Sequence, residues 1–188
     1  VLAFSFLALF TYSKMAHVLF IPGNYYYRSL KPAGTLEPID FEDEELETMG
    51  VRVLEEYTWK DLLDAQACIK CGRCQENCPA YLSGKELSPM HFIQNIAAQN
   101  KTRGEVLLKV SEDARTEEQQ ALLDEGVVGT VISEDALWQC TTCRACSELC
   151  PARVVHPDKD IKARTYQVCM ESAFPPEAQQ TFRNLETN

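Results

Sequence analysis

The chain has 188 residues, enough for one domain or for a domain with attached segments. Hydrophobic residues make up 45% and charged residues 24% of it, as in an ordinary folded protein. The net charge of −10 argues against a nucleic-acid-binding protein, which would normally present a basic patch.

Residues 1–22 are expected to be the end of a transmembrane helix. They open with the apolar string VLAFSFLALF, which is too short for a complete span of about 20 residues. Aromatic and basic residues follow: Tyr12, Lys14, Tyr25, Tyr26, Tyr27, Arg28 and Lys31. They are typical of an aromatic belt and of a positive cytoplasmic flank. A buried helix of a soluble core is the alternative, and in both cases Pro22-Gly23 should end the helix.

Residues 23–56 are expected to form a linker at the cytoplasmic membrane surface. They carry Pro32, Gly34 and Pro38 and then the acidic run FEDEE, a composition typical of turns and loops. Residues 57–172 are expected to be one helical domain, because apolar residues such as Leu62 and Leu63 begin to recur at helical spacing near its start.

Helix caps recur along this domain. Ser88-Pro89 predicts a helix start, and Thr116 with Gln119 forms a capping-box pattern whose helix Gly126 should close. Ser133 should cap a further helix. Helices are also expected at 158–172 and 176–186, and GVVGTVI (126–132) is the one strand candidate.

Eight of the nine cysteines lie in two copies of one motif. CIKCGRCQENCP (68–79) and CTTCRACSELCP (140–151) both read C-x2-C-x2-C-x3-C-P, with a shift of 72 residues. Disulfide frameworks space their cysteines less regularly, which argues against a disulfide-bonded scaffold. Two full motifs of this type indicate two [4Fe–4S] clusters, and a zinc site remains the alternative.

In this motif three cysteines hold one cluster and the fourth usually binds the other cluster. The spacing therefore assigns cluster 1 to Cys68, Cys71, Cys74 and Cys150, and cluster 2 to Cys140, Cys143, Cys146 and Cys78. Gly72 should relieve crowding beside cluster 1, with Ala145 as its equivalent in the second motif. No acid–base catalytic residue is predicted.

The remaining candidates are weaker. Cys169 is expected to be a small buried hydrophobe. His91 and His156 are expected to be packing or surface residues, with His156 near enough to a cluster to tune it by hydrogen bonding. A solvated basic surface is expected from Lys85, Lys101, Arg103 and Lys109. His17 is either an interfacial histidine or an axial ligand of a b-type haem, since a histidine inside a membrane segment is usually functional.

The long helical join between the motifs resembles the α-helical ferredoxin domain found in the iron–sulfur subunits of succinate dehydrogenase and of heterodisulfide reductase. SKMAHVLFIPGNYYYRSLKPAG resembles the last membrane helix of nitrate reductase gamma-type cytochrome b domains, in which the histidine matching His17 binds haem. LEPIDFEDEE, both cysteine motifs and the tail MESAFPPEAQQTFRNLETN resemble the membrane-bound heterodisulfide reductase-related iron–sulfur proteins.

The resemblance implies a mainly α protein, with an α-helical dicluster ferredoxin at the cytoplasmic side of the inner membrane. Residues 173–188 would lead into a cysteine-rich domain beyond this chain. The implied function is electron transfer between a cytoplasmic redox partner, electron-transferring flavoprotein, and haem b with menaquinone. The electron-transfer part of a heterodisulfide reductase-, lactate- or glycerol-3-phosphate-type oxidoreductase is the first alternative, and a zinc-stapled scaffold is the second.

Overall fold

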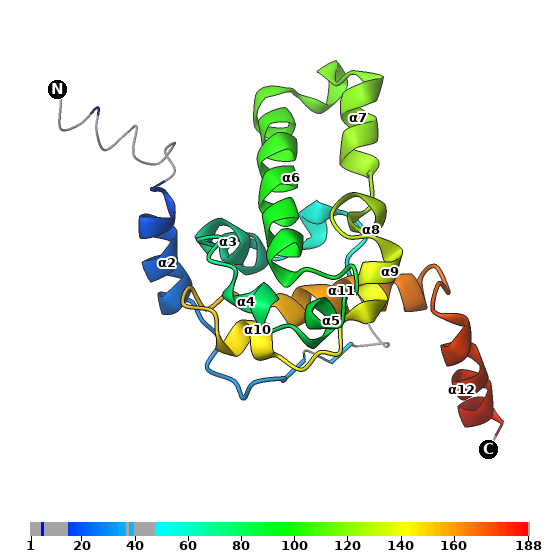
Figure 1. The fold of residues 1–188 in the computed structure, drawn as a ribbon. Helices are drawn as coiled ribbons and strands as arrows, with labels where there is room; N and C mark the ends of the chain where they lie inside the picture. Colours follow the sequence, from blue (N-terminus) through cyan, green and yellow to red (C-terminus); the bar gives the residue numbers. More distant parts are fainter. Residues whose placement is uncertain (1–4, 6–14, 37, 40–47, 188) are drawn as a thin grey trace.

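The computed structural model describes residues 5, 15–36, 38–39 and 48–187, and these are mainly helical (Figure 1). The helices are α2 (His17–Tyr26), η1 (Leu54–Glu56), α3 (Trp59–Ala67), α4 (Arg73–Glu76), α5 (Pro79–Leu82), α6 (Pro89–Lys109), η2 (Glu112–Ala114), α7 (Glu117–Asp124), α8 (Val127–Thr130), α9 (Glu134–Gln139), α10 (Ala145–Glu148), α11 (His156–Cys169) and α12 (Pro176–Glu186). The prediction of a mainly α protein is confirmed.

Helix α6 stands at the centre of the fold, with α3 packed against it and α7 beside it (Figure 1). The Ser88 hydroxyl accepts a hydrogen bond from the backbone N–H of His91, and Pro89 occupies the first helical position. The inner face of α6 buries Phe92, Ile93 and Ile96. These side chains join a core to which the segment before α3 also contributes, through the buried residues Val51, Leu54 and Tyr57.

Three predicted caps are confirmed. Besides Ser88, the hydroxyl of Thr116 accepts from the backbone N–H of Gln119 in a capping box, and that of Ser133 accepts from Ala136. The predicted helix over 176–186 is confirmed, and the one expected over 158–172 runs from His156 to Cys169. Glu125, not Gly126, takes the cap position after α7, and Gly126 has an ordinary extended backbone.

Pro22 lies inside α2, so the prediction that it ends the helix is wrong. The missing N–H of proline removes one helical bond, but the turn beyond it is held to the domain. There the Asn24 amide donates a hydrogen bond of 2.8 Å to the carbonyl of Ala152. Most of the predicted membrane segment, residues 1–4 and 6–14, lies outside the described residues. Among the helices that are described, none has the length and apolar character needed to cross a membrane.

The segment GVVGTVI is not a strand. Within the described residues it forms the short helix α8 and one isolated bridge between Val128 and Ile132. Gly129 adopts a φ of +99°, which glycine tolerates, and its N–H donates to the carbonyl of Ile132 at 2.8 Å. The resulting turn folds the segment back, so that Val127 and Val131 are buried in the core without a partner strand.

Buried ion pairs join α3 to α11. The Lys159 side chain, 0% exposed, places its ammonium 2.6 Å from Oδ2 of Asp64 and 3.4 Å from Oδ1 of Asp61. Lys162 lies 2.5 Å from Asp61, and Lys60 lies 2.6 Å from Asp64. Each buried carboxylate therefore faces two ammonium groups, the arrangement that a buried charge requires.

Arg103 is also buried, at 1% exposure, so the prediction that it belongs to a solvated surface is wrong. It points from α6 toward α7, where its guanidinium donates to the carbonyls of Leu123 and Glu125 and pairs with Glu55 at 2.9 Å. It thus satisfies carbonyls at the end of α7 that have no helical partner. Exposed basic residues do follow the prediction at Lys85, Lys101 and Lys109.

We expect Gly50→Ala to destabilise the fold by about 3 kcal/mol, because it combines a left-handed backbone with a steric clash. Gly50 has a φ of +90°, and an added Cβ would lie 2.5 Å from the carbonyl oxygen of Lys162 and about as close to the backbone nitrogen of Tyr166. Gly84→Ala is the matched control, since Gly84 has a φ of +78° but no heavy atom within 4 Å of such a Cβ. If urea denaturation showed the same loss in the free energy of unfolding for both variants, the clash with α11 would not be the cause.

Candidate functional site

The two cysteine motifs fold alike. The short helices α4 and α10 begin directly after the loop that carries the second cysteine of each motif, and they are offset by the same 72 residues as the motifs. The backbone is left-handed at Lys70 and Gly72 in the first loop, and at Thr142 and Arg144 in the second. Arg144 is therefore the equivalent of Gly72, and the prediction that Ala145 holds this place is wrong. Arg144 adopts a φ of +63° there and pairs with Asp158 at 2.5 Å.

Four cysteines line one cavity, here called cavity 1, with an open volume of about 320 Å³ including its mouth to solvent. Three of them come from the first motif and one from the second: Cys68, Cys71, Cys74 and Cys150. Apolar side chains, Ile69, Met90 and Val154 among them, complete most of the wall. These are the four residues that the motif spacing groups together.

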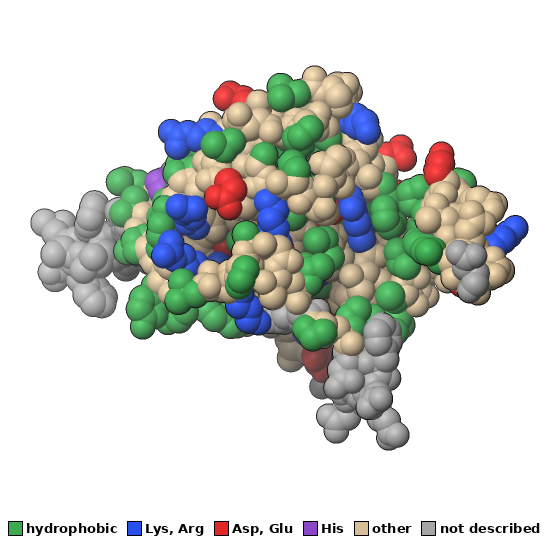
Figure 2. All heavy atoms as spheres, turned by 90° about the horizontal axis from the view of Figure 1, so that it is seen from below, with side chains coloured by type: hydrophobic (Ala, Val, Ile, Leu, Met, Phe, Trp, Pro, Cys, Tyr) green, Lys and Arg blue, Asp and Glu red, His purple; other side chains and the backbone are tan. Residues whose placement is uncertain are grey.

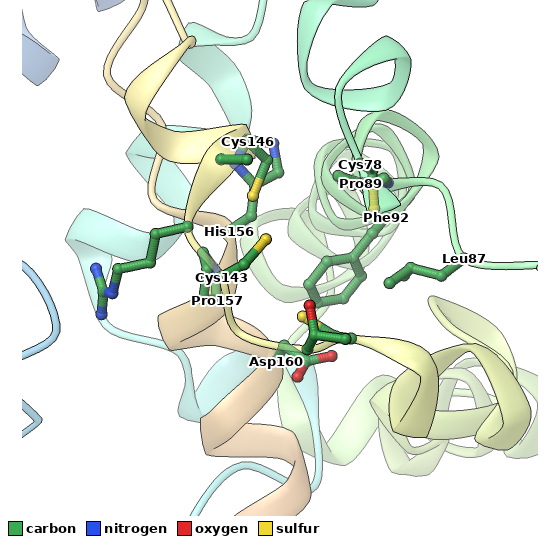
Figure 3. A pocket seen from close by; sticks show the side chains of 13 residues that line it. Cys78, Leu87, Pro89, Phe92, Cys143, Cys146, His156, Pro157 and Asp160 are labelled. Atoms are coloured by element: carbon green, nitrogen blue, oxygen red, sulfur yellow. The ribbon is translucent and has the colours of Figure 1, made fainter. Parts of the chain in front are cut away.

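The other four motif cysteines line a second cavity, cavity 2, with an open volume of about 440 Å³: Cys78, Cys140, Cys143 and Cys146. In Figure 3 the labelled second-motif cysteines and His156 lie on one side of this cavity, and Cys78, Leu87 and Phe92 lie on the other. Each cavity therefore combines three cysteines of one motif with the last cysteine of the other. The two motifs also touch directly, because α4 of the first packs against α10 of the second.

Burial dominates the acidity of these thiols. It raises the pKa of Cys74 and of Cys146 to about 12, with smaller contributions from neighbouring thiols, and it raises the pKa of Cys140 to about 11, with a smaller contribution from Asp160. Burial also raises the pKa of Cys68. These four thiols are therefore protonated at neutral pH in the absence of a metal. Because a ligating cysteine must be a thiolate, loading with iron would release these protons.

The backbone around the thiols favours negative charge. The amide of Lys70 partly offsets the effect of burial on the pKa of Cys68, and the amide of Thr142 does the same for Cys140. The N–H of Val154 donates to Sγ of Cys150 at 3.4 Å. Loops that mix left- and right-handed residues gather N–H groups into concavities that hold anions, iron–sulfur clusters included.

These observations fit iron–sulfur clusters. Each cavity offers four thiols, the ligand set of a [4Fe–4S] cluster, in mainly apolar walls. In the described part of the chain no group of three or more His, Cys, Asp or Glu side chains is placed so that it could hold a metal ion. The thiols of a cluster stand farther apart than those around one ion, because the irons lie between them.

Helix α11 brings two further side chains to the cavities, His156, which is predicted to lie near a cluster, and Asp160, which is not predicted. His156, at its first turn, lines both cavities, and Asp160, one turn later, lines cavity 2. Burial raises the pKa of Asp160 to about 7, although Nε of Arg164 lies 3.0 Å from Oδ2 of its carboxyl group. The Arg164 guanidinium also donates to the carbonyls of Leu137 and Cys140 and so holds the start of the second loop.

Helix α2 docks beside Cys150, the last cysteine of the second motif. The Tyr25 hydroxyl donates to the carbonyl of Pro151 at 2.9 Å, next to the bond from Asn24 to Ala152. His17 lies at the other end of α2, outside both cavities.

Two further candidates lie away from the cavities. Cys169 is exposed as the last residue of α11, where the helix leaves the core, so its predicted burial is wrong. His91 is exposed on α6, which agrees with its predicted surface role.

Residues 64–154 match the model of the 4Fe–4S dicluster domain. The whole chain is 39% identical to the EtfAB:quinone oxidoreductase of Syntrophomonas wolfei. Over 80% of its length it is 30% identical to a probable membrane-anchored ferredoxin of Chromohalobacter salexigens. Over 59% it is 33% identical to an iron–sulfur subunit of the CoB–CoM heterodisulfide reductase of Methanopyrus kandleri. Comparison with solved structures gives no match.

The chain spans less than half the length of each of these relatives, namely 28%, 23% and 42% in the same order. The residues that match the dicluster domain begin just before Cys68 and end just beyond Cys150, so they include both complete cysteine motifs. Residues 64–154 are therefore similar to a 4Fe–4S dicluster domain, which supports iron–sulfur electron transfer, and the chain is similar along its whole length to part of a larger oxidoreductase.

Proposed function

We propose that the chain relays single electrons through two [4Fe–4S] clusters as part of a membrane-bound, quinone-linked oxidoreductase. One end of the relay would be a cytoplasmic redox partner, electron-transferring flavoprotein, and the other would be haem b and menaquinone in the membrane. Cluster 1 would be held in cavity 1 and cluster 2 in cavity 2 by the ligand sets Cys68, Cys71, Cys74, Cys150 and Cys78, Cys140, Cys143, Cys146.

The observation that carries this proposal is the crossed lining of the two cavities. Each cavity takes its fourth thiol from the other motif, as expected for a pair of clusters in one ferredoxin domain. When bound, such clusters supply one-electron redox centres. The chain itself contributes thiolate ligands, apolar walls and backbone N–H groups. Because His156 lines both cavities, the two centres would be separated by little more than one side chain.

The membrane end of the relay is proposed to lie at cluster 1. Helix α2 begins within the predicted membrane segment 1–22 and continues beyond it, where its Tyr25 and Asn24 bond to the loop directly after Cys150, a cysteine of cavity 1. His17, at the start of α2, is proposed as one axial ligand of haem b. The names of two relatives, an EtfAB:quinone oxidoreductase and a membrane-anchored ferredoxin, support a quinone and a membrane as partners.

The lower face of the molecule, as oriented in Figure 1, is rich in basic side chains. On the face shown in Figure 2 more Lys and Arg than Asp and Glu side chains are visible, although the chain carries a net charge of −10. A polar groove in this region is lined by five basic residues and two acidic ones: Arg28, Lys31, Lys60, Arg144, Arg153, Glu148 and Asp158. Arg28 and Lys31 also belong to the predicted membrane flank, so this groove would lie at the cytoplasmic membrane surface, where anionic lipid head groups attract basic side chains.

A second candidate is the electron-transfer part of a heterodisulfide reductase-type enzyme. The similarity to the iron–sulfur subunit of the Methanopyrus kandleri enzyme favours it. The two candidates share both clusters and differ in the unit that accepts the electrons, so reduction of menaquinone by the purified protein distinguishes them.

We expect the anaerobically purified protein to contain about eight irons and eight acid-labile sulfides for these two cavities. After reduction with dithionite, low-temperature EPR should show the broadened signal of two interacting clusters, because the cavities are adjacent. Iron, zinc and sulfide would be assayed on the same sample. Zinc without labile sulfide would overturn the electron-transfer proposal and leave a structural scaffold.

A further inference from the structure

His156 is buried between the two cavities and has no hydrogen-bond partner for its ring. The residue is only 4% exposed, and neither Nδ1 nor Nε2 of its ring forms a hydrogen bond in the described structure. The residue lines cavity 1 and cavity 2 alike. A buried ring nitrogen without a hydrogen-bond partner destabilises a fold, so a ring placed in this way requires a group in the cavities to which it can bond.

The position of the ring is fixed by the chain around it. His156 begins α11 and is followed by Pro157, which has no backbone N–H and fits the first turn. The backbone N–H of His156 donates to Oγ of Ser147 at 3.3 Å, and Ser147 directly follows the cavity-2 residue Cys146. The backbone of His156 is therefore fixed between the two motifs, and this places its imidazole there.

The protein surroundings leave the ring nitrogens free to point at the cavities. Burial lowers the pKa of His156 to about 4, and the nearby Lys159 adds to this effect against smaller opposite contributions from Asp64 and the backbone of Val154. The Val154 carbonyl does not meet the geometry of a hydrogen bond to the ring. Lys159 itself is occupied by Asp64 at 2.6 Å. In each protonation state an imidazole keeps at least one N–H to donate.

We propose that His156 is a positioning residue that donates a ring N–H hydrogen bond to a sulfur atom of the clusters. The bond would raise the reduction potential of the cluster that accepts it, in the middle of the relay. Sulfur gains negative charge when a cluster is reduced, so a donor to that sulfur stabilises the reduced form more than the oxidised form. The proposal rests on the proposed function, because it requires both clusters.

The test compares His156→Leu with the native protein at full natural length, by EPR-monitored redox titration. The equilibrium constant for reducing at least one cluster should fall about tenfold, which is 59 mV for a one-electron couple. His156→Asn and His156→Gln place an amide donor near the positions of Nδ1 and Nε2, so one of them should recover most of the shift. His91→Leu is the matched control, since His91 is an exposed histidine outside both cavities, and it should change neither potential.

A second measurement keeps the proposal testable if the Leu variant fails to load clusters. Native protein labelled with ¹⁵N-histidine would be reduced and measured by pulsed EPR, with the His156→Gln variant, or His156→Asn if only that one loads, as reference. A ¹⁵N coupling that is present in the native protein and absent in the variant supports the hydrogen bond. Unchanged potentials in a loaded Leu variant, or no such coupling, would overturn the proposal. Native protein without iron and sulfide would instead refute the proposed function.

Discussion

Cys78→Ser is expected to remove the cluster of cavity 2 and to leave the cluster of cavity 1 in place. Cys78 lies in the first motif but lines cavity 2, where the other three thiols come from the second motif. Iron and labile sulfide from the two cavities should fall to about half, and the broadening from cluster–cluster interaction should disappear from the EPR spectrum. Cys150→Ser should have the mirror effect, with loss of the cluster of cavity 1.

The control for these variants is Cys169→Ser, which changes an exposed cysteine outside both cavities. It should leave the iron content and the EPR spectrum unchanged. To identify the surviving cluster, Cys78→Ser can be combined with Cys71→Ser, which should remove the remaining iron. If Cys78→Ser combined with Cys143→Ser removed it instead, the motifs would each hold their own cluster and the crossed assignment would be wrong.

Lys159→Met is expected to destabilise the protein by about 3–5 kcal/mol, because it leaves the buried carboxylates of Asp64 and Asp61 short of a cation. The ammonium of Lys159 lies 2.6 Å from Asp64 and is fully buried. Urea denaturation followed by circular dichroism under anaerobic conditions measures the loss. Lys85→Met, at an exposed position, should change stability by less than about 0.5 kcal/mol.

The pH dependence of this loss gives its cause. Burial alone would raise the pKa of Asp64, but Lys159 and Lys60 outweigh it and hold the pKa below the ordinary value of 3.8. A carboxyl with a lowered pKa contributes stability above its unfolded pKa, and this contribution is lost as the pH falls through the folded pKa. In the Met variant Asp64 becomes easier to protonate. The deficit should therefore shrink as the pH is lowered toward about 4, and a deficit independent of pH would point to lost packing.

The parts of the fold that local rules govern could be predicted from the sequence. The caps at Ser88, Thr116 and Ser133 depend only on residues within one turn, and all three form. The grouping of the cysteines into two sets depends on a spacing that is repeated in full, and the two cavities are lined by those sets.

The features that could not be predicted depend on contacts between distant segments. Arg103 and Lys159 look like surface residues by type, and only the packing of α6 and α11 shows that they are buried. His156 is predicted to lie near one cluster, but that it lines both cavities follows only from the packing of α11. That Arg144 is the equivalent of Gly72 could have been predicted from the 72-residue shift, since both positions directly precede a short helix.

The docking of α2 has a consequence for how the sequence can vary. Asn24 and Tyr25 reach carbonyl oxygens of Ala152 and Pro151, and a carbonyl is present at every position of a chain. Substitutions in the loop after Cys150 can therefore accumulate, within the limits of packing, without breaking these bonds. Lys60 is different, because its ammonium is shared by Asn24 and Asp64 at 2.7 and 2.6 Å. A change at Lys60 would affect both the contact of α2 with the loop after Cys150 and the buried ion pairs, so Lys60 should tolerate fewer substitutions than that loop.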